Sequence, residues 1–190
     1  MVVNPFLIFY YPGARGDFLA SVLTDTLSNN SSTMVTTPGM LNYKKAHYLD
    51  KFSMLQPYCS LSDITNQLSI RIRPVSFNDV LTISYYCLTK IAVEDRPITS
   101  IIDDVIRHEK IILQHNIDPI FKHVVDFPKL FDMTFLSKFY NRLTNSNIPS
   151  HIYDYAKQNI NINPIITLNN YREYLDISES DLERLKIQYG

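Results

Sequence analysis

The apolar and polar positions along the chain predict strands that alternate with helices. Residues 6–11 form an unbroken apolar run, which is typical of a strand buried on both faces of a parallel sheet. Residues 68–73 alternate apolar and polar side chains instead, and Pro74 ends this second predicted strand. A third core strand is predicted over residues 122–127.

Apolar side chains at helical spacing follow the predicted strands. The stripe after the first strand consists of Phe18, Leu19, Val22, Leu23 and Leu27. Ser76 and Asp79 are spaced like the partners of a capping box, which predicts a helix over about residues 77–91. Thr99 or Ser100 is predicted to cap the next helix. Its inward stripe consists of Ile101, Ile102, Val105, Ile106, Ile112 and Leu113.

The last third of the chain is predicted to be mainly helical. Asp132 is expected to cap a helix whose inward residues are Leu136, Phe139, Tyr140 and Leu143. Further helices are predicted near residues 150–158 and 178–188. Because strands alternate with helices, we expect an α/β fold with a central, mostly parallel sheet and helices on both faces. Residues 1–190 contain no repeat or linker-like boundary and are predicted to form a single domain.

Composition and charge exclude several classes of protein. A chain of 190 residues with 45% hydrophobic and 12% aromatic side chains has enough apolar material for a core, which excludes disordered and fibrous classes. A net charge of −1, without long runs of like charge, argues against a dedicated nucleic-acid binder. We expect no signal peptide and no membrane span, and the two cysteines fit a reduced, cytoplasmic setting.

The loop between the first predicted strand and the following helix is the first candidate site. It holds Gly13 and Gly16, two of only 4 glycines in the chain. Glycines at this place let backbone N–H groups converge on an anion, and the helix dipole favours negative charge there. The loop lacks the Gly-Lys-Ser/Thr ending of a Walker A motif, so Arg15 would supply the positive charge. Asp17 would repel an anion unless its side chain caps the backbone. The alternative is a tight strand-to-helix turn.

Lys45 and His47 form a second candidate site. In an extended segment, residues two apart point to the same face, so the two side chains would act together. A neutral histidine is well suited to take a proton from a hydroxyl group. The alternative is a surface histidine beside solvated lysines.

Arg73 and Ser84 form a third candidate site. Arg73 ends a predicted parallel strand, and ligands of such sheets bind at the carboxyl ends of the strands. A hydroxyl on the following helix, such as that of Ser84, can share a phosphate with the arginine. Arg71 is a rival for this role. Alternatively, Arg71 and Arg73 form the polar face of a half-exposed strand, and Ser84 is a small core residue.

Taken in order, these motifs resemble those of the P-loop sulfotransferases that use 3′-phosphoadenosine 5′-phosphosulfate. That family has a Tyr-Pro loop with glycine before a helix, then Lys-x-His, Arg-x-Pro, Ser-Tyr-Tyr and an aromatic-x-x-Leu segment. The similar positions here are Tyr11–Phe18, Lys45 with His47, Arg73, Ser84, and Phe127–Leu130. The resemblance covers roughly residues 5–143.

The chain departs from the family pattern at several positions. Gly13 stands where the family has Lys or Arg directly after the proline, with Arg15 as a positional substitute. Pro74 follows Arg73 without a spacer, and Lys129 replaces a glutamate. No Arg-Lys-Gly segment occurs near the C-terminal end.

The resemblance implies a three-layer P-loop-type fold and a particular reaction. A sulfuryl group would move from the nucleotide donor to a hydroxyl or amine of a small-molecule or saccharide acceptor, without a metal. The implied donor-binding residues are Pro12, Gly13, Ala14, Arg15, Gly16, Asp17, Phe18, Arg73 and Ser84. The implied catalytic residues are Arg15, Lys45 and His47, with His47 as the base. The alternative is a non-catalytic P-loop module that binds a nucleotide or a partner, for example in a phage; a nucleotide kinase comes third.

Overall fold

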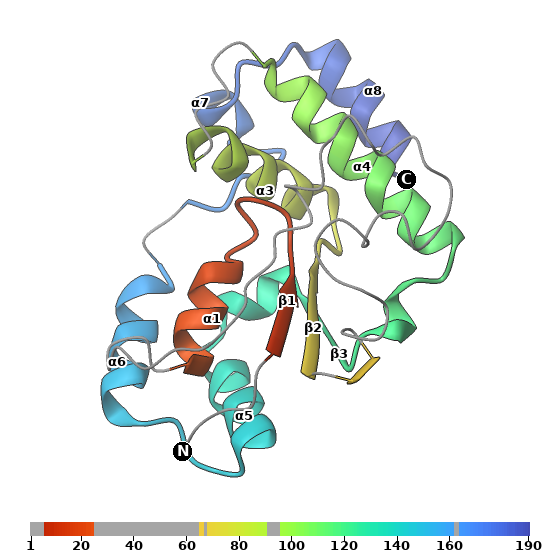
Figure 1. Ribbon diagram of the computed structural model, residues 1–190. Helices are drawn as coiled ribbons and strands as arrows, with labels where there is room; N and C mark the ends of the chain where they lie inside the picture. Colours follow the sequence, from red (N-terminus) through yellow and green to blue (C-terminus); the bar gives the residue numbers. More distant parts are fainter. Residues whose placement is uncertain (1–5, 25–64, 67, 91–95, 162–163) are drawn as a thin grey trace.

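The chain folds as an α/β protein in the part that the computed structural model describes, residues 6–24, 65–66, 68–90, 96–161 and 164–190 (Figure 1). The strands are β1 (Phe6–Phe9), β2 (Leu68–Arg73) and β3 (His123–Asp126). The α-helices are α1 (Gly16–Thr24), α3 (Phe77–Lys90), α4 (Ile98–Gln114), α5 (Met133–Thr144), α6 (Ser150–Asn159), α7 (Tyr171–Tyr174) and α8 (Glu179–Tyr189). There are also two short 3₁₀ helices among the described residues, η4 (Asp118–Ile120) and η5 (Phe127–Phe131).

The three described strands form one parallel sheet in the order β1-β2-β3. The register places Phe9 beside Arg71, and Arg71 beside Val124. At the carboxyl end of the sheet, Arg73 lies beside Asp126. Parallel pairing of these strands confirms the prediction of an α/β fold with a parallel sheet.

Successive side chains of a strand point to opposite faces of the sheet, and both faces are covered by other parts of the chain. Ile8, Ile70 and Val125 belong to the larger core, which also contains inward residues of α1, α5 and α6. On the other face, Phe9 packs with a second cluster from the end of α4 and the segment around η4. That cluster consists of Ile112, Ile117 and Phe121.

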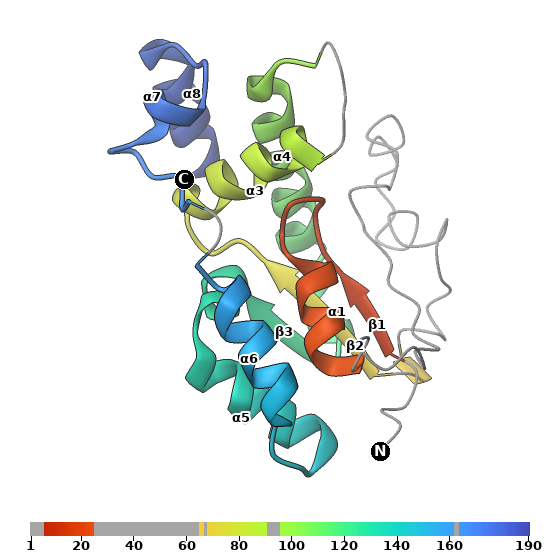
Figure 2. The same cartoon turned by 90° about the vertical axis from the view of Figure 1, so that its left-hand side faces the viewer.

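The helices fall into two groups around the sheet (Figures 1 and 2). Helices α1, α5 and α6 lie along one face, whereas α3, α4, α7 and α8 gather beyond the carboxyl ends of the strands. Helix α8 packs on α4, and the Gln188 amide donates a hydrogen bond to Asp103 at 2.7 Å. Helices therefore cover part of the carboxyl edge of the sheet.

A polar stripe on α3 binds the segment between α6 and α7. Thr82 donates to the carbonyl of Ile166 at 3.1 Å and accepts from its N–H at 2.9 Å. Asn78, one helical turn earlier, accepts from the N–H of Leu168 at 3.2 Å. Tyr86, one turn later, donates to the Pro164 carbonyl at 2.7 Å. These bonds hold an irregular segment on the helix through side chains alone.

Several predicted boundaries are confirmed. Strand β2 has the predicted bounds, and the capping box is formed, since the N–H of Asp79 donates to Ser76 Oγ at 3.2 Å. The Asp79 carboxylate accepts from the N–H of Ser76 at 3.0 Å. Asp132 caps α5 by accepting from two N–H groups of the first turn. Strand β1, however, ends at Phe9 instead of continuing to Tyr11.

Two predictions about α4 were wrong. The helix begins at Ile98, directly after Pro97, and has no side-chain cap, so neither Thr99 nor Ser100 is the cap. Pro97 is the N-cap residue, with φ = −65° and ψ = 140°, so the helix starts earlier than the polar residues suggest. Leu113 was expected to face inward but is 82% exposed. Ile112 points to the second face of the sheet, and a helical step of 100° turns Leu113 away from it.

Some predictions lie outside the described residues. These are Leu27 in the apolar stripe after the first strand, and the candidate pair Lys45 and His47. No helix in the described part of the chain combines the length and the apolar character that a membrane span needs.

Candidate functional site

The carboxyl edge of the sheet brings together the segments that follow the three strands. These are the glycine-containing loop after β1, Arg73 and Pro74 at the end of β2, and Asp126 at the end of β3. In parallel α/β sheets this edge is where ligands bind. The first and third candidate sites therefore both lie at this edge.

The glycine loop is a tight turn that packs directly on α3. The Ala14 N–H donates to the Tyr11 carbonyl at 2.8 Å, and Gly13 has φ = +90°, as in a type II turn with Pro12 before the glycine. A Cβ on Gly13 would lie 2.4 Å from the Ile83 carbonyl oxygen and 2.6 Å from the Cys87 nitrogen. Gly13 is therefore required for both the turn and its contact with the helix.

Tyr10 covers the second glycine. A Cβ on Gly16 would lie 2.1 Å from the Tyr10 ring, so the ring rests on the first residue of α1. The Tyr10 hydroxyl donates to Asp17 Oδ1 at 2.6 Å. Burial, together with the Asp17 carboxylate, raises the pKa of Tyr10, so the hydroxyl keeps its proton. Asp17 thus turns toward Tyr10 and not toward the helix backbone.

The first turn of α1 carries unpaired backbone donors. The first intrahelical bond runs from the Leu19 N–H to the Arg15 carbonyl at 3.0 Å. Within the described part of the chain, the N–H groups of Gly16, Asp17 and Phe18 donate to no acceptor. Such N–H groups at a helix start can bind an anion, and the helix dipole adds to the attraction.

Arg15 points away from these donors and binds the end of α6. Its guanidinium donates to the carbonyls of Asn159 at 2.6 Å and Ile160 at 3.3 Å. It also stacks against the rings of Phe18 and Phe131, at 4.2 Å and 4.7 Å from their centroids. The residue is only 7% exposed, and burial lowers its pKa. The arginine therefore stabilises the C-terminal end of α6 in this arrangement.

Arg73, the predicted phosphate ligand, is held by two carboxylates. Its Nε lies 2.8 Å from Asp126 Oδ1, and its Nη1 lies 2.9 Å from Asp118 Oδ2. Hydrogen bonds to Asp126 and Asp118 raise the pKa of Arg73 against a smaller opposing effect of burial. A bound anion would have to compete with both carboxylates.

Arg71, the rival, is buried in the same network. Its Nη2 donates to both oxygens of Glu109, at 2.6 Å and 2.8 Å, and its Nη1 lies 2.8 Å from Asp118 Oδ1. Burial would lower the pKa of Arg71, but Glu109, Tyr11 and Asp118 raise it overall. Tyr11 joins the glycine loop to this network, since its hydroxyl donates to Glu109 Oε1 at 2.6 Å.

Ser84 is enclosed in the core side of α3. It is fully buried, and its hydroxyl has no hydrogen-bond partner among the described residues. The neighbouring residue Ile83 and the nearby Tyr86 contact Gly13, so α3 brings Ser84 close to the glycine loop. No hydrogen bond joins Ser84 to Arg73 in the described part of the chain.

The structure thus groups the predicted residues differently from the sequence. Gly13 of the loop packs on α3 close to Ser84, Arg15 binds the end of α6, and Arg73 belongs to a network that the sequence did not predict. The missed members are Tyr11, Glu109, Asp118 and Asp126. The sequence did contain a signal for this network, since Arg71 and Arg73 lie on the central strand of the sheet. A buried arginine requires carboxylate partners, so such partners could have been expected.

His108 on α4 makes the stability of this region depend on pH. Burial lowers the pKa of His108 to about 4, Asp104 opposes this shift, and Arg107 and Arg96 add to it. Its ring stacks on that of Tyr11 with centroids 6.3 Å apart. The neutral form is therefore favoured in the folded protein.

We expect the free energy of unfolding to fall by about 3 kcal/mol as the pH drops from 6.5 to 4, because the unfolded state binds the proton first. Urea unfolding at a series of pH values measures this. His108→Phe serves as the control, because it keeps the aromatic contact with Tyr11 but cannot titrate. Identical pH profiles for the two proteins would show that His108 is not the cause.

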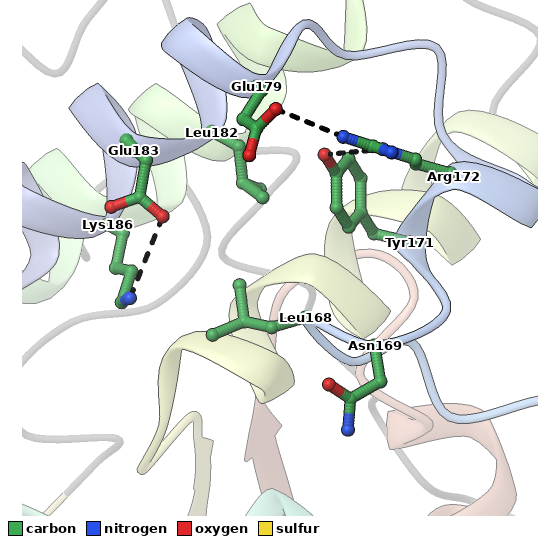
Figure 3. Close-up of a pocket in the computed structure, with 8 residues that line it drawn as sticks. All are labelled: Leu168, Asn169, Tyr171, Arg172, Glu179, Leu182, Glu183 and Lys186. Carbon is green, nitrogen blue, oxygen red and sulfur yellow. Dashed lines mark hydrogen bonds and ion pairs between the residues drawn. The ribbon is translucent and has the colours of Figure 1, made fainter.

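A further pocket, of about 380 Å³, lies between α7 and α8 (Figure 3). Its charged side chains pair with one another. Arg172 lies 3.2 Å from Glu179, and Lys186 lies 3.8 Å from Glu183. None of the predicted site residues lines this pocket.

Among the described residues, no group of three or more His, Cys, Asp or Glu side chains is placed to hold a metal ion.

Comparison with protein-family models, with curated proteins and with solved structures finds no match to this chain.

Proposed function

We propose that this chain is a sulfotransferase-like domain of the three-layer P-loop type that binds 3′-phosphoadenosine 5′-phosphosulfate at the carboxyl edge of its sheet. One observation carries the proposal. The N–H groups of Gly16, Asp17 and Phe18, which donate to no described residue, lie at the start of α1, directly after the glycine turn that follows β1. The covered faces of the sheet and the order of the motifs along the chain add support.

The proposed reaction transfers a sulfuryl group to a hydroxyl or amine, for example of a saccharide. His47 would take the acceptor proton while the acceptor oxygen or nitrogen bonds to sulfur. The bond from sulfur to the phosphate oxygen breaks, and 3′-phosphoadenosine 5′-phosphate leaves. Lys45 would offset the charge on the transferred group. Arg73 and Ser84 would hold the 3′-phosphate, which requires the carboxylates on Arg73 to be displaced.

Calorimetric titration with 3′-phosphoadenosine 5′-phosphate tests the binding site. We expect dissociation constants of about 10 µM, typical of enzyme–substrate affinity. Asp17→Asn should bind about fivefold more tightly, because it removes a negative charge beside the anion. Asp17→Pro removes the same charge and also the backbone N–H, so it should bind more weakly than Asp17→Asn.

The two Asp17 variants are a matched pair, because both lose the hydrogen-bonded carboxylate and differ in the backbone donor. Proline is tolerated in the first turn of a helix, and Gly16 before it has no Cβ to clash. Circular dichroism checks that both variants fold. Absence of heat at millimolar nucleotide would contradict the proposed function, and equal affinities of the two variants would contradict the role of α1.

A non-catalytic nucleotide- or partner-binding module is the second candidate. It is favoured by Arg15, whose guanidinium binds α6 and the aromatic rings and so is not directed at an anion. The ion pairs of Arg73 with Asp118 and Asp126 also favour this second candidate, because they occupy the arginine that would bind the 3′-phosphate. The two candidates differ in product, since only a sulfotransferase yields a sulfated acceptor that mass spectrometry detects.

A further inference from the structure

A pocket of about 440 Å³ lies on the α4 side of the carboxyl edge of the sheet. It is bounded by the end of β2, the second half of α4, η4 and the end of α8. Its volume suits a small organic molecule. The first turn of α1 contributes no residue to it, but it shares Arg73 with the proposed nucleotide site.

One wall of the pocket is apolar and partly open. Val75 is 48% exposed, and Leu113, at the end of α4, is 82% exposed. Ile106 and Tyr189 also line the pocket, and the Tyr189 ring lies 5.9 Å from that of Phe77. Large aliphatic side chains at this exposure leave apolar surface in water, which an apolar ligand would cover.

The pocket also offers two hydrogen-bond donors. Arg73 uses its Nε and Nη1 for Asp126 and Asp118, and within the described residues its Nη2 has no partner. Lys110 lines the same pocket and forms no ion pair with a described residue. Both groups donate and neither accepts, so a matching ligand group must accept hydrogen bonds.

The charges of the network limit how negative this ligand can be. The carboxylates that surround the arginines cancel their charge, so the site as a whole is close to neutral. Arg73 and Lys110 line the pocket together with the carboxylates of Glu109 and Asp118, and Arg71 and Asp126 belong to the same network outside the lining. A head group with several charges would meet repulsion that a single charge spread over two oxygens largely avoids.

We propose that this pocket binds a small molecule with an aromatic or aliphatic body and one carboxylate. The body lies against Val75 and Leu113, and the carboxylate accepts from Arg73 Nη2 and Lys110 Nζ. This pocket does not require the proposed nucleotide-binding function, but the carboxylate and the 3′-phosphate would compete for Arg73.

Titration with 3-phenylpropionate, 3-phenylpropanol and phenyl phosphate, followed by NMR of the full chain, tests the proposal. We expect 3-phenylpropionate to bind with a dissociation constant of about 1 mM, a normal value for so small a ligand. Lys110→Met should weaken the propionate about fivefold and leave the propanol unchanged. Leu113→Glu should weaken both by about threefold, because it removes apolar contact surface at the mouth of the pocket.

Lys138→Met is the matched control, because Lys138 is an exposed lysine on α5 and lines no part of this pocket. It should leave all affinities unchanged. The proposal is overturned if 3-phenylpropionate shows no saturable binding at about 10 mM, roughly ten times the expected constant. It is also overturned if Lys110→Met and Leu113→Glu bind like the unmodified chain, or if phenyl phosphate binds more tightly than the propionate.

Discussion

Gly13→Ala is expected to destabilise the fold by about 4 kcal/mol, from backbone strain and overpacking together. The added Cβ would meet the Ile83 carbonyl oxygen and the Cys87 nitrogen, which are backbone atoms of α3 and cannot move independently of the helix. The positive φ of Gly13 is also unfavourable for alanine. Urea unfolding followed by circular dichroism measures the effect.

Gly16→Ala provides the comparison, because its φ is not positive and its neighbour is a side chain, the Tyr10 ring. In a Tyr10→Ala background the clash with the ring disappears, and Gly16→Ala should cost much less than in the unmodified chain. Gly13→Ala should remain costly in that same background. If Gly13→Ala unfolds at the same urea concentration as the unmodified chain, the tight contact between the loop and α3 does not exist.

Arg71→Met is expected to reduce the free energy of unfolding by about 3 kcal/mol, since it leaves carboxylates without their buried partner. Arg71 is only 3% exposed and binds Glu109 through both carboxylate oxygens. Asp118 also loses one of its two arginines. Thermal and urea unfolding measure this loss near neutral pH.

The double variant Arg71→Met with Glu109→Gln should recover at least half of that loss. Glutamine removes the unpaired charge and still accepts the hydrogen bond from Tyr11. Arg172→Met is the surface control, because its ion pair with Glu179 is exposed and should contribute less than about 1 kcal/mol. A double variant as unstable as Arg71→Met alone would mean that the cost is not one of unpaired charge.

The boundaries of strands and helices could be predicted from the sequence wherever a single residue at the boundary determines it. Strand β2 ends at Pro74, and α5 begins at Asp132, and both signals act within a few residues. Strand β1 was predicted too long because Tyr10 and Tyr11 are apolar in pattern but leave the sheet. Their hydroxyls bind Asp17 and Glu109, partners that an apolar run does not reveal.

The candidate site was harder to predict because its partners are far apart in the sequence. Arg71 binds Glu109 across 38 residues, and Arg73 binds Asp118 across 45. A resemblance of motifs gives the types and order of residues, but not which carboxylate neutralises which arginine. Arg15 illustrates the point, since its position in the loop suggested an anion ligand and its side chain binds carbonyls of α6 instead.

The contact between Arg15 and α6 also bears on the order of folding. The arginine and its carbonyl partners are separated by 144 and 145 residues, and Thr82 and Ile166 by 84. Contacts of such high sequence separation slow folding, because the chain must close a long loop before it gains them. During synthesis the glycine loop leaves the ribosome early but reaches its final arrangement only after α6 has emerged. The first segment of the fold to be made is therefore among the last to be completed.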